Sequence, residues 1–325
     1  MARECGSQSD NLTINSPLLP EELSLKYSAS SDSELTLQNL MGETLALKLP
    51  PAVELIYLIE KVATLASQGW LTTVPNSPLK PGLISYLCDQ LLVRCSTQEL
   101  AQCLKIQRFG RNGNIFLVTC PSPAVLSYSM MRFQETYESP KFEGEIFRRD
   151  TYASWYRSQK ADGAFTYYED RHGFNFNDRA LKRIGSYKLD DLTPAESLIL
   201  STLASGNQDS SYIIGAPLDE EQKPHPAFID HEIAHALWGT SRSYRNKIKA
   251  ELDALGEQLA PLKIHILEQG YSTSKLEDEC QAFLLEGTAE LKTRGIEVSR
   301  EMRSSILRMK KIFKNFQSRY GLTPK

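Results

Sequence analysis

The chain has 325 residues, a formal net charge of −3 at pH 7 and an isoelectric point near 6.0. This length suffices for one large or two modest domains, and the nearly balanced charge gives no general attraction to nucleic acid or to a membrane surface. The six cysteines are scattered without a Cys-x-x-Cys pair, which is typical of a reducing compartment rather than of a disulfide framework.

The location of the protein is predicted from the apolar segments that the sequence lacks. No uninterrupted apolar run approaches the length of a membrane span, and the first residues do not form the apolar segment of a signal peptide. We therefore expect a cytoplasmic protein, or one exported without a cleavable signal peptide, for example as a secreted effector. Neither a membrane nor a nucleic acid is expected as a partner, and the oligomeric state stays open.

The first third of the chain changes in character near residue 49. Residues 1–48 are rich in Ser, Asn, Leu and acidic residues, so we expect a loosely ordered segment in which alternating leucines between Leu35 and Leu49 predict one hairpin. Apolar residues then recur at helical spacing from Val53 to Leu65.

Two further local signals follow before the middle of the chain. A helix is expected from Ser96 to Leu104, because Ser96 and Glu99 form a capping box at its start. Arg111-Asn112-Gly113 separates two β-prone runs and predicts a second hairpin.

The middle third is aromatic and mixed. We expect a strand around Phe142–Phe147, a short helix over Thr151–Ser158, a strand over Phe165–Tyr168 and a polar loop over Glu169–Asn175. His172 in that loop is a candidate metal or catalytic residue, although a histidine in a polar loop is more often a surface hydrogen-bonding group.

The last third begins with clear helix and strand signals. Thr193, Pro194 and Glu196 supply the cap, the first-turn proline and the capping-box glutamate of a helix. Residues Ser211–Gly215 then form a short β-prone segment.

The pattern His-Glu-x-x-His lies in the apolar run from Ala227 to Trp238. Positions four apart share one face of an α-helix, so His231 and His235 present both imidazoles to the same point. Glu232 lies about 100° around the helix, where its carboxylate reaches a water on a metal without being a ligand. Such a motif also arises by chance on solvated helices, but this helix is expected to be buried, and buried His and Glu need partners.

A hydrolytic zinc site keeps three protein ligands and one open position, so a third ligand is required. No glycine and third histidine of the metzincin pattern follow His235. The acidic helix expected over Leu276–Gly287 offers Glu279, which precedes Ala282, and Glu286, which precedes Ala289.

The motif followed at this distance by Glu-x-x-Ala resembles the gluzincin branch of the zincin metallopeptidases, over about residues 210–291. The resemblance implies that the first residue of Glu-x-x-Ala is the third ligand. Glu279 is favoured because its neighbours are more apolar, Glu286 is the alternative, and Asp278 is a candidate acceptor for a ligand imidazole N–H. We expect Glu279→Ala to reduce zinc affinity at least tenfold and Glu286→Ala to change it little.

The resemblance also assigns roles around the ligands. Zincins use a Tyr or His outside the ligand set to bind the developing oxyanion, and Tyr271 and His265 are the local candidates. A strand before the metal helix forms the sheet edge that accepts an extended substrate, a place we expect for Ser211–Gly215, although an ordinary core strand fits that segment as well.

The sequence thus predicts a helix-rich α+β protein. It would comprise a loosely ordered segment over residues 1–48, an α+β region over 49–190 and a zincin-like helical metal-binding region over 191–325. The expected activity is hydrolysis of peptide bonds in a protein or peptide substrate, with one Zn²⁺ per chain, a metal-bound water as nucleophile and Glu232 as general base.

Two alternatives remain at this stage. One is a two-histidine, one-carboxylate iron enzyme, which the same ligands would form. The other is a non-catalytic, metal-stabilised protein that binds an acidic partner through the basic helix expected from Val298 to Tyr320. The presence of Glu232 argues against a purely structural site, because such a site needs no base.

Overall fold

The structure is a computed structural model. It describes residues 11–14, 25–28, 34–38, 44–48, 82, 84–85, 88–89, 92–111, 113–186, 192–204, 211–219 and 221–323. The strands are β1 (Asn11–Ile14), β2 (Leu25–Ser28), β3 (Glu34–Gln38), β4 (Thr44–Lys48), β5 (Lys105–Phe109), β6 (Ile115–Cys120), β7 (Phe174–Asn177) and β8 (Tyr212–Pro217). The α-helices are α3 (Thr97–Cys103), α4 (Pro123–Glu138), α5 (Arg149–Gln159), α6 (Tyr167–Asp170), α7 (Asp178–Ser186), α8 (Pro194–Ala204), α9 (Pro226–Thr240), α10 (Arg242–Leu255), α11 (Ala260–Glu268), α12 (Leu276–Glu286), α13 (Thr288–Thr293) and α14 (Arg300–Tyr320). Three short 3₁₀ helices are η1 (Leu92–Arg94), η2 (Gly256–Leu259) and η3 (Thr273–Lys275). The expected helix-rich α+β class is confirmed.

The strands of the N-terminal part form an antiparallel sheet in the order β1-β2-β3-β4. The hairpin expected between Leu35 and Leu49 is present as β3 and β4, in which Leu35 pairs with Leu47. Two more strands, β1 and β2, join it, so more of this segment is regular than its composition suggests. The helix expected from Val53 to Leu65 lies outside the described residues.

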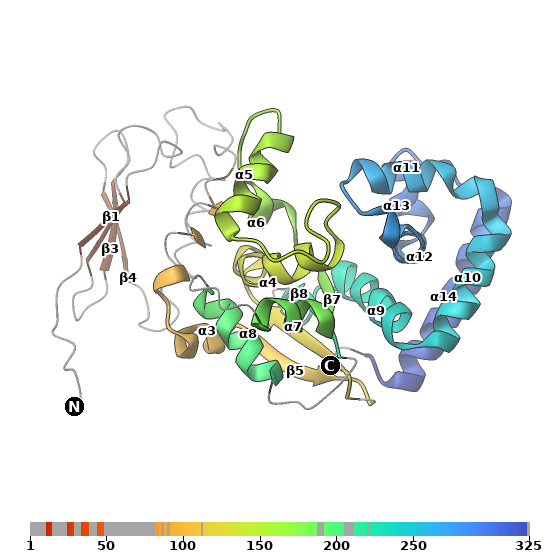
Figure 1. The fold of residues 1–325 in the computed structure, drawn as a ribbon, viewed down its shortest axis with the longest axis horizontal. Helices are drawn as coiled ribbons and strands as arrows, with labels where there is room; N and C mark the ends of the chain where they lie inside the picture. Colours follow the sequence, from red (N-terminus) through yellow and green to blue (C-terminus); the bar gives the residue numbers. More distant parts are fainter. Residues whose placement is uncertain are drawn as a thin grey trace.

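A mixed sheet in the order β5-β6-β8-β7 forms the centre of the remaining chain (Figure 1). The hairpin predicted around Arg111–Gly113 joins β5 to β6, and β8 then pairs parallel to β6 and antiparallel to β7. The β-prone segment Ser211–Gly215 therefore contributes to an interior strand, the second of the two placements considered, and not to a sheet edge. The edges are β5 and β7, and the sequence alone assigned β7 in part to a loop.

The two faces of this sheet contact two different cores. In β6, Phe116 and Val118 pack into one core with α4 and α8, whereas Ile115 and Leu117 pack into the other with α9, α10, α12 and α14. This alternation is the period of two expected of a strand buried on both faces. Strands β6 and β7 precede residue 190, whereas β8, which lies between them in the sheet, follows it. The domain boundary expected at residue 190 therefore divides one sheet.

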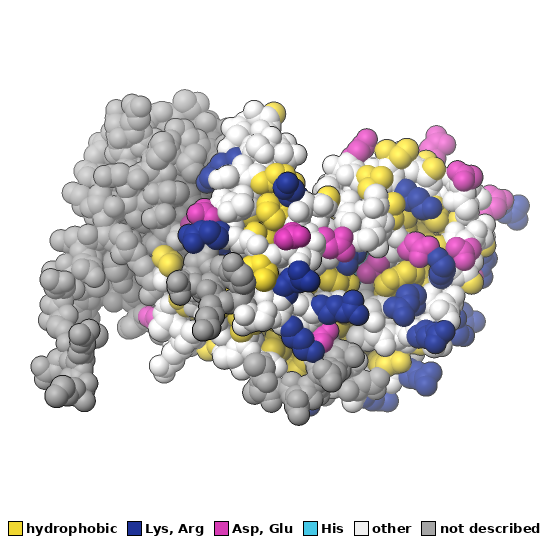
Figure 2. All heavy atoms as spheres, viewed as in Figure 1, with side chains coloured by type: hydrophobic (Ala, Val, Ile, Leu, Met, Phe, Trp, Pro, Cys, Tyr) yellow, Lys and Arg dark blue, Asp and Glu magenta, His cyan; other side chains and the backbone are white. Residues whose placement is uncertain are grey.

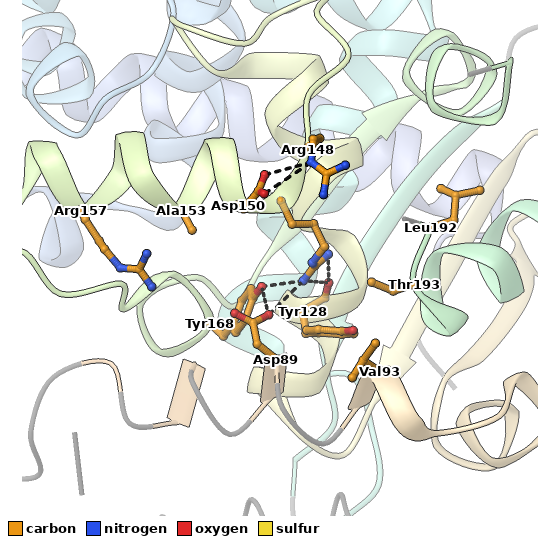
Figure 3. A pocket seen from close by; sticks show the side chains of 11 residues that line it. Asp89, Val93, Tyr128, Arg148, Asp150, Ala153, Arg157, Tyr168, Leu192 and Thr193 are labelled. Atoms are coloured by element: carbon orange, nitrogen blue, oxygen red, sulfur yellow. Dashed lines mark hydrogen bonds and ion pairs between the residues drawn. The ribbon is translucent and has the colours of Figure 1, made fainter. Parts of the chain in front are cut away.

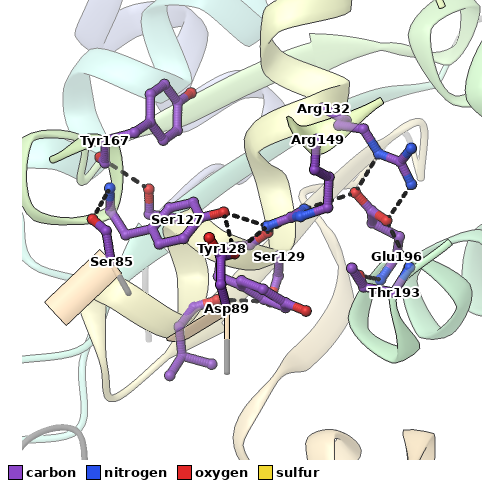
Figure 4. Close-up of polar contacts among 12 residues, drawn as sticks. Ser85, Asp89, Ser127, Tyr128, Ser129, Arg132, Arg149, Tyr167, Thr193 and Glu196 are labelled. Carbon is purple, nitrogen blue, oxygen red and sulfur yellow. Dashed lines mark hydrogen bonds and ion pairs between the residues drawn. The ribbon is translucent and has the colours of Figure 1, made fainter. Parts of the chain in front are cut away.

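A buried ion network holds the first core together (Figure 4). Arg132 of α4 binds Glu196 of α8 through Nε at 2.8 Å and Nη2 at 2.5 Å, and Arg149 binds the same carboxylate at 3.0 Å. Glu196 also accepts from the Thr193 N–H at 2.8 Å, which completes the predicted capping box. The Glu196 carboxylate therefore caps the first turn of α8 and also balances the charges of Arg132 and Arg149.

The prediction of two aromatic strands in the middle third is wrong. The segment around Phe142–Phe147 forms turns and irregular chain, and Phe165–Tyr168 leads into the short helix α6. Their aromatic rings pack on one another, as in the contact of Phe142 with Phe147 at 4.6 Å between ring centroids. The apolar side chains meet in this cluster and do not follow the alternation of a sheet.

None of the described helices is both long and apolar enough to cross a membrane.

Candidate metal centre

The metal-binding motif lies on α9, between the central sheet and α12 (Figure 1). Ile233, Ala234 and Leu237 of this helix are buried in the second core, which fixes its position against the sheet. His235 is buried and His231 retains 13% exposure of its side chain. The helix therefore presents its two imidazoles at the margin of the core, where one side of the site meets solvent.

Helix α12 brings Glu279 to these imidazoles. The Nε2 atom of His235 lies 3.7 Å from one Glu279 oxygen, and that of His231 lies 4.0 Å from the other. One atom from each of the three side chains lies within 4.8 Å of the others, so the group can hold a metal ion. Two ligands of a tetrahedral zinc are about 3.3 Å apart, close to the separations seen here.

Two other carboxylates orient the imidazoles. The Nδ1 atom of His235 lies 2.8 Å from Asp278, and that of His231 lies 2.8 Å from Glu286. A carboxylate accepts a hydrogen bond, so each Nδ1 donates to its carboxylate and each Nε2 is directed toward Glu279, where its lone pair would be available to a metal ion. The expected role of Asp278 fits this contact, whereas Glu286 lies behind a ligand and does not join the ligand group.

Three buried polar atoms at or beside this point have no hydrogen-bond partner within the described part of the chain. They are Nε2 of His235, Oε2 of Glu279 and Oε2 of Glu232. A buried polar atom without a partner costs free energy. The donor set therefore fits a cation, since a single ion would satisfy His235 and Glu279 together.

The pKa shifts of Glu279 and His235 also fit a bound cation. Burial raises the pKa of Glu279 well above its usual range, and the nearby carboxylates Glu138 and Asp278 add to the effect against the opposing influence of His235. Burial lowers the pKa of His235, but Asp278 and Glu279 more than offset this and raise it. The centre is a buried concentration of negative charge that a divalent cation would neutralise.

Glu232 is held beside the ligands by β7 and the loop before it. The Asn175 side chain lies close to the Glu232 carboxylate, and its Oδ1 accepts from the Tyr212 hydroxyl at 2.7 Å. A Cβ atom on Gly173 would lie 2.2 Å from Oε1 of Glu232, so only glycine leaves room for this carboxylate. Burial raises the pKa of Glu232, although His231 and His235 oppose the rise.

Sequence reasoning missed Asn175 and Gly173. The sequence signal that could have identified this strand is the repeat Phe174-Asn175-Phe176-Asn177, which follows Gly173. Its phenylalanines are buried in the first core, and Asn175 lies close to Glu232. A strict alternation of this kind predicts a strand with one polar face.

The remaining candidate residues take different places. Tyr271 accepts a hydrogen bond from Arg171 at 3.1 Å, and its ring, like that of His231, contacts Phe283. Burial and Glu279 raise the pKa of Tyr271, so its hydroxyl keeps its proton and is available as a donor.

The two other candidate histidines stand outside the ligand group. His265 contacts Phe283 through its ring, with 6.2 Å between the centroids. His172 contacts Phe228, and burial lowers its pKa.

A separate pocket of about 460 Å³ lies over the ion network of the first core (Figure 3). Arg149 points into it and is engaged by Glu196, by the Tyr168 hydroxyl and by Asp89. These interactions satisfy the guanidinium within the chain, so this pocket does not compete with the metal centre as the candidate site.

Comparisons with protein-family models, with curated proteins and with solved structures found no match.

Proposed function

We propose that the protein is a zinc-dependent peptidase of the gluzincin type, with His231, His235 and Glu279 as ligands and Glu232 as general base. The observation that supports it is the convergence of His231, His235 and Glu279 on one point, where Nε2 of His235 and Oε2 of Glu279 are buried without a partner among the described residues. Next to His231 in the motif, Glu232 adds a buried carboxylate oxygen that also has no partner among those residues. A structural site has no use for the carboxylate, because structural zinc closes with a fourth protein ligand.

Each residue has a role that follows from its contacts. Zinc, when bound, supplies Lewis-acid polarisation of the scissile carbonyl and lowers the pKa of a water molecule. Glu232 accepts the proton of that water and delivers it to the leaving amine. Asn175 fixes the direction of the Glu232 carboxylate, and Tyr271, held by Arg171, donates to the oxygen that becomes negative.

The non-catalytic alternative finds less support. In that alternative, the cations of α14 bind an acidic partner. Two of these cations are already paired within the chain, because Arg308 binds Glu251 at 2.8 Å and Lys314 binds Asp230 at 2.9 Å. Part of the basic face of this helix therefore serves contacts within the chain.

The proposal is tested by metal analysis and peptide cleavage on the same samples. We expect about one zinc per chain in the wild type and none in His231→Ala. Glu232→Gln should retain zinc and lose about 10²- to 10⁴-fold in cleavage of a mixed peptide library, because only proton acceptance is removed. The exposed Glu301→Gln serves as control.

Three results would contradict the proposal. Iron in place of zinc would favour the two-histidine, one-carboxylate alternative. A wild type without any transition metal after zinc is supplied would refute the metal site. Loss of zinc together with activity in Glu232→Gln would show that Glu232 is not a base beside the site.

A further inference from the structure

A groove runs along the side of the metal centre that lies behind His235. It consists of a hollow of about 680 Å³ and an adjoining one of about 250 Å³, which share Tyr137, Asn177, Arg179 and Lys275. The walls are the end of β7, helix α7, the C-terminal end of α9 and the segment η3. The two hollows therefore form one continuous surface.

The groove is basic although the chain is acidic overall. Its cations are Arg179, Lys182, Arg183, Arg245 and Lys275, and its acids are Glu143, Asp178 and Asp278. Figure 2 shows dark blue side chains gathered where α7 lies in Figure 1. Residues three and four apart share a helix face, so the three cations of α7 point along one line.

Four of the five cations are engaged within the chain, and Arg179 is the exception. Lys182 pairs with Asp178 at 2.9 Å, and Lys275 lies 3.7 Å from Glu143. Arg183 and Arg245 donate to neutral backbone carbonyls, those of Gly144 and Trp238. The Arg179 side chain is exposed, and its guanidinium has no hydrogen bond or ion pair to any residue that the structure describes. Because the third acid of the groove, Asp278, is bound to His235, the net charge that the groove presents is positive.

The groove also borders the candidate catalytic residues. Asp278 lines it and is bound to His235, a predicted ligand. Tyr212 lines it and donates to Asn175, whose side chain lies close to Glu232. A chain bound in the groove would thus lie one side chain away from the metal ligands and two from the base.

We propose that this groove binds an acidic segment of the peptide substrate, an inference that rests on the proposed function. Arginine pairs with a carboxylate through two parallel hydrogen bonds, which suits the free guanidinium of Arg179. Tyr137 and Trp238, both partly exposed, add aromatic surface for the rest of a peptide. A nucleic acid carries a phosphate at every nucleotide and would place some of them against Glu143 and Asp178, which interrupt the basic surface, whereas a peptide can carry its carboxylates opposite the cations alone.

The test measures binding and cleavage separately. Two fluorescein-labelled peptides, one with a run of Glu and one with Gln at the same positions, are titrated by anisotropy against zinc-loaded Glu232→Gln. We expect the Glu peptide to bind at least about tenfold tighter, and the difference to shrink as salt is raised. Cleavage by the wild type is followed on libraries flanked by Glu or by Gln.

Charge-reversed variants locate the effect. Arg179→Glu with Lys182→Glu should weaken binding of the Glu peptide about tenfold and leave the Gln peptide unchanged. Arg300→Glu with Lys311→Glu, on exposed positions of α14, makes the same change of net charge and should alter binding less than twofold. Circular dichroism and zinc content confirm that both variants fold.

The outcomes separate the two proposals. Equal affinity for both peptides, equal loss in the control variant, or displacement of the Glu peptide by a tighter-binding single-stranded oligonucleotide would overturn the groove inference. If the wild type cleaves neither library, while Glu232→Gln binds the Glu peptide more tightly than the Gln peptide and the added change of Arg179 and Lys182 to Glu removes that preference, the peptidase proposal fails and the groove stands as a site for an acidic peptide.

Discussion

At the scale of single residues, the centre depends on which nitrogen of each histidine is free. Asp278 and Glu286 each accept from an Nδ1 atom at 2.8 Å, and this leaves both Nε2 atoms directed at Glu279. Arg294 binds Glu286 in turn, at 2.5 Å. Carboxylates in this position fix the tautomer of a ligand histidine and raise its basicity.

The first prediction concerns these carboxylates. Glu279→Ala should lower zinc affinity most, because it removes a ligand, and Glu286→Ala should lower it about 10- to 100-fold, because His231 loses its orienting partner. Competition with a chromogenic chelator measures both. The exposed Glu290→Ala should bind as the wild type does. From the sequence, we expected Glu286→Ala to change zinc affinity little, and the contact between Glu286 and His231 now predicts a clear loss. An affinity equal to that of the wild type in Glu286→Ala would contradict the latter expectation and support the former.

At the scale of elements, helices α4 and α8 are joined by a charge pair that is fully buried. Both side chains of the pair Arg132–Glu196 have no exposed surface. Burial alone would raise the pKa of Glu196, but Arg149 and Arg132 more than offset it and hold that pKa below its ordinary value of 4.5. The ionised carboxylate therefore stabilises the packing of α8 on α4.

The second prediction is a pH-dependent loss of stability. A depressed carboxyl pKa contributes stability above the unfolded value near 4.5, and this is lost as pH falls through the folded value. At pH 7, Glu196→Gln should cost about 3–5 kcal/mol, because Arg132 is left buried without its counter-charge. Denaturant unfolding at pH 7 and at pH 3.5 should show the difference from wild type narrowing at the lower pH. A constant difference would mean that the charge of Glu196 is not the cause.

At the scale of the whole molecule, the centre is built where the parts on the two sides of the sheet meet. Segment Tyr271–Lys275, just before α12, is bound to the opposite side by several contacts. Arg171 binds Tyr271, Glu143 accepts from Ser272 and Ser274 at 2.9 Å, and Lys275 lies 3.4 Å from the ring centroid of Tyr137. A metal ion bound between α9 and α12 would therefore stabilise the region where the two sides of the molecule are in contact.

The third prediction follows from that position. Zinc at about 1,000 times its dissociation constant stabilises the folded state by about 4 kcal/mol, so its removal with EDTA should lower the melting temperature by roughly 10 °C. Added zinc should restore it. His235→Ala, which lacks a ligand, should respond to neither treatment. Equal melting curves of the wild type with and without EDTA would contradict a metal at this junction.

The sequence by itself determined the local features. Helical periodicity is the same in every helix, so the spacing of His231 and His235 already placed both imidazoles on one face. Capping boxes at Ser96 and Thr193 and the turn at Arg111–Gly113 likewise depend only on neighbours a few residues apart, and the structure contains all three.

Only the tertiary structure decided which distant groups meet. Glu279 and Glu286 have similar local sequence contexts, and the packing of α12 against α9 determines that one faces the Nε2 atoms and the other an Nδ1 atom. Strand order is likewise non-local, so β8 lay inside the sheet and β7 at its edge. The physical reason is that periodicity fixes the direction of a side chain on its own element, whereas packing of elements far apart in the chain fixes what lies in that direction.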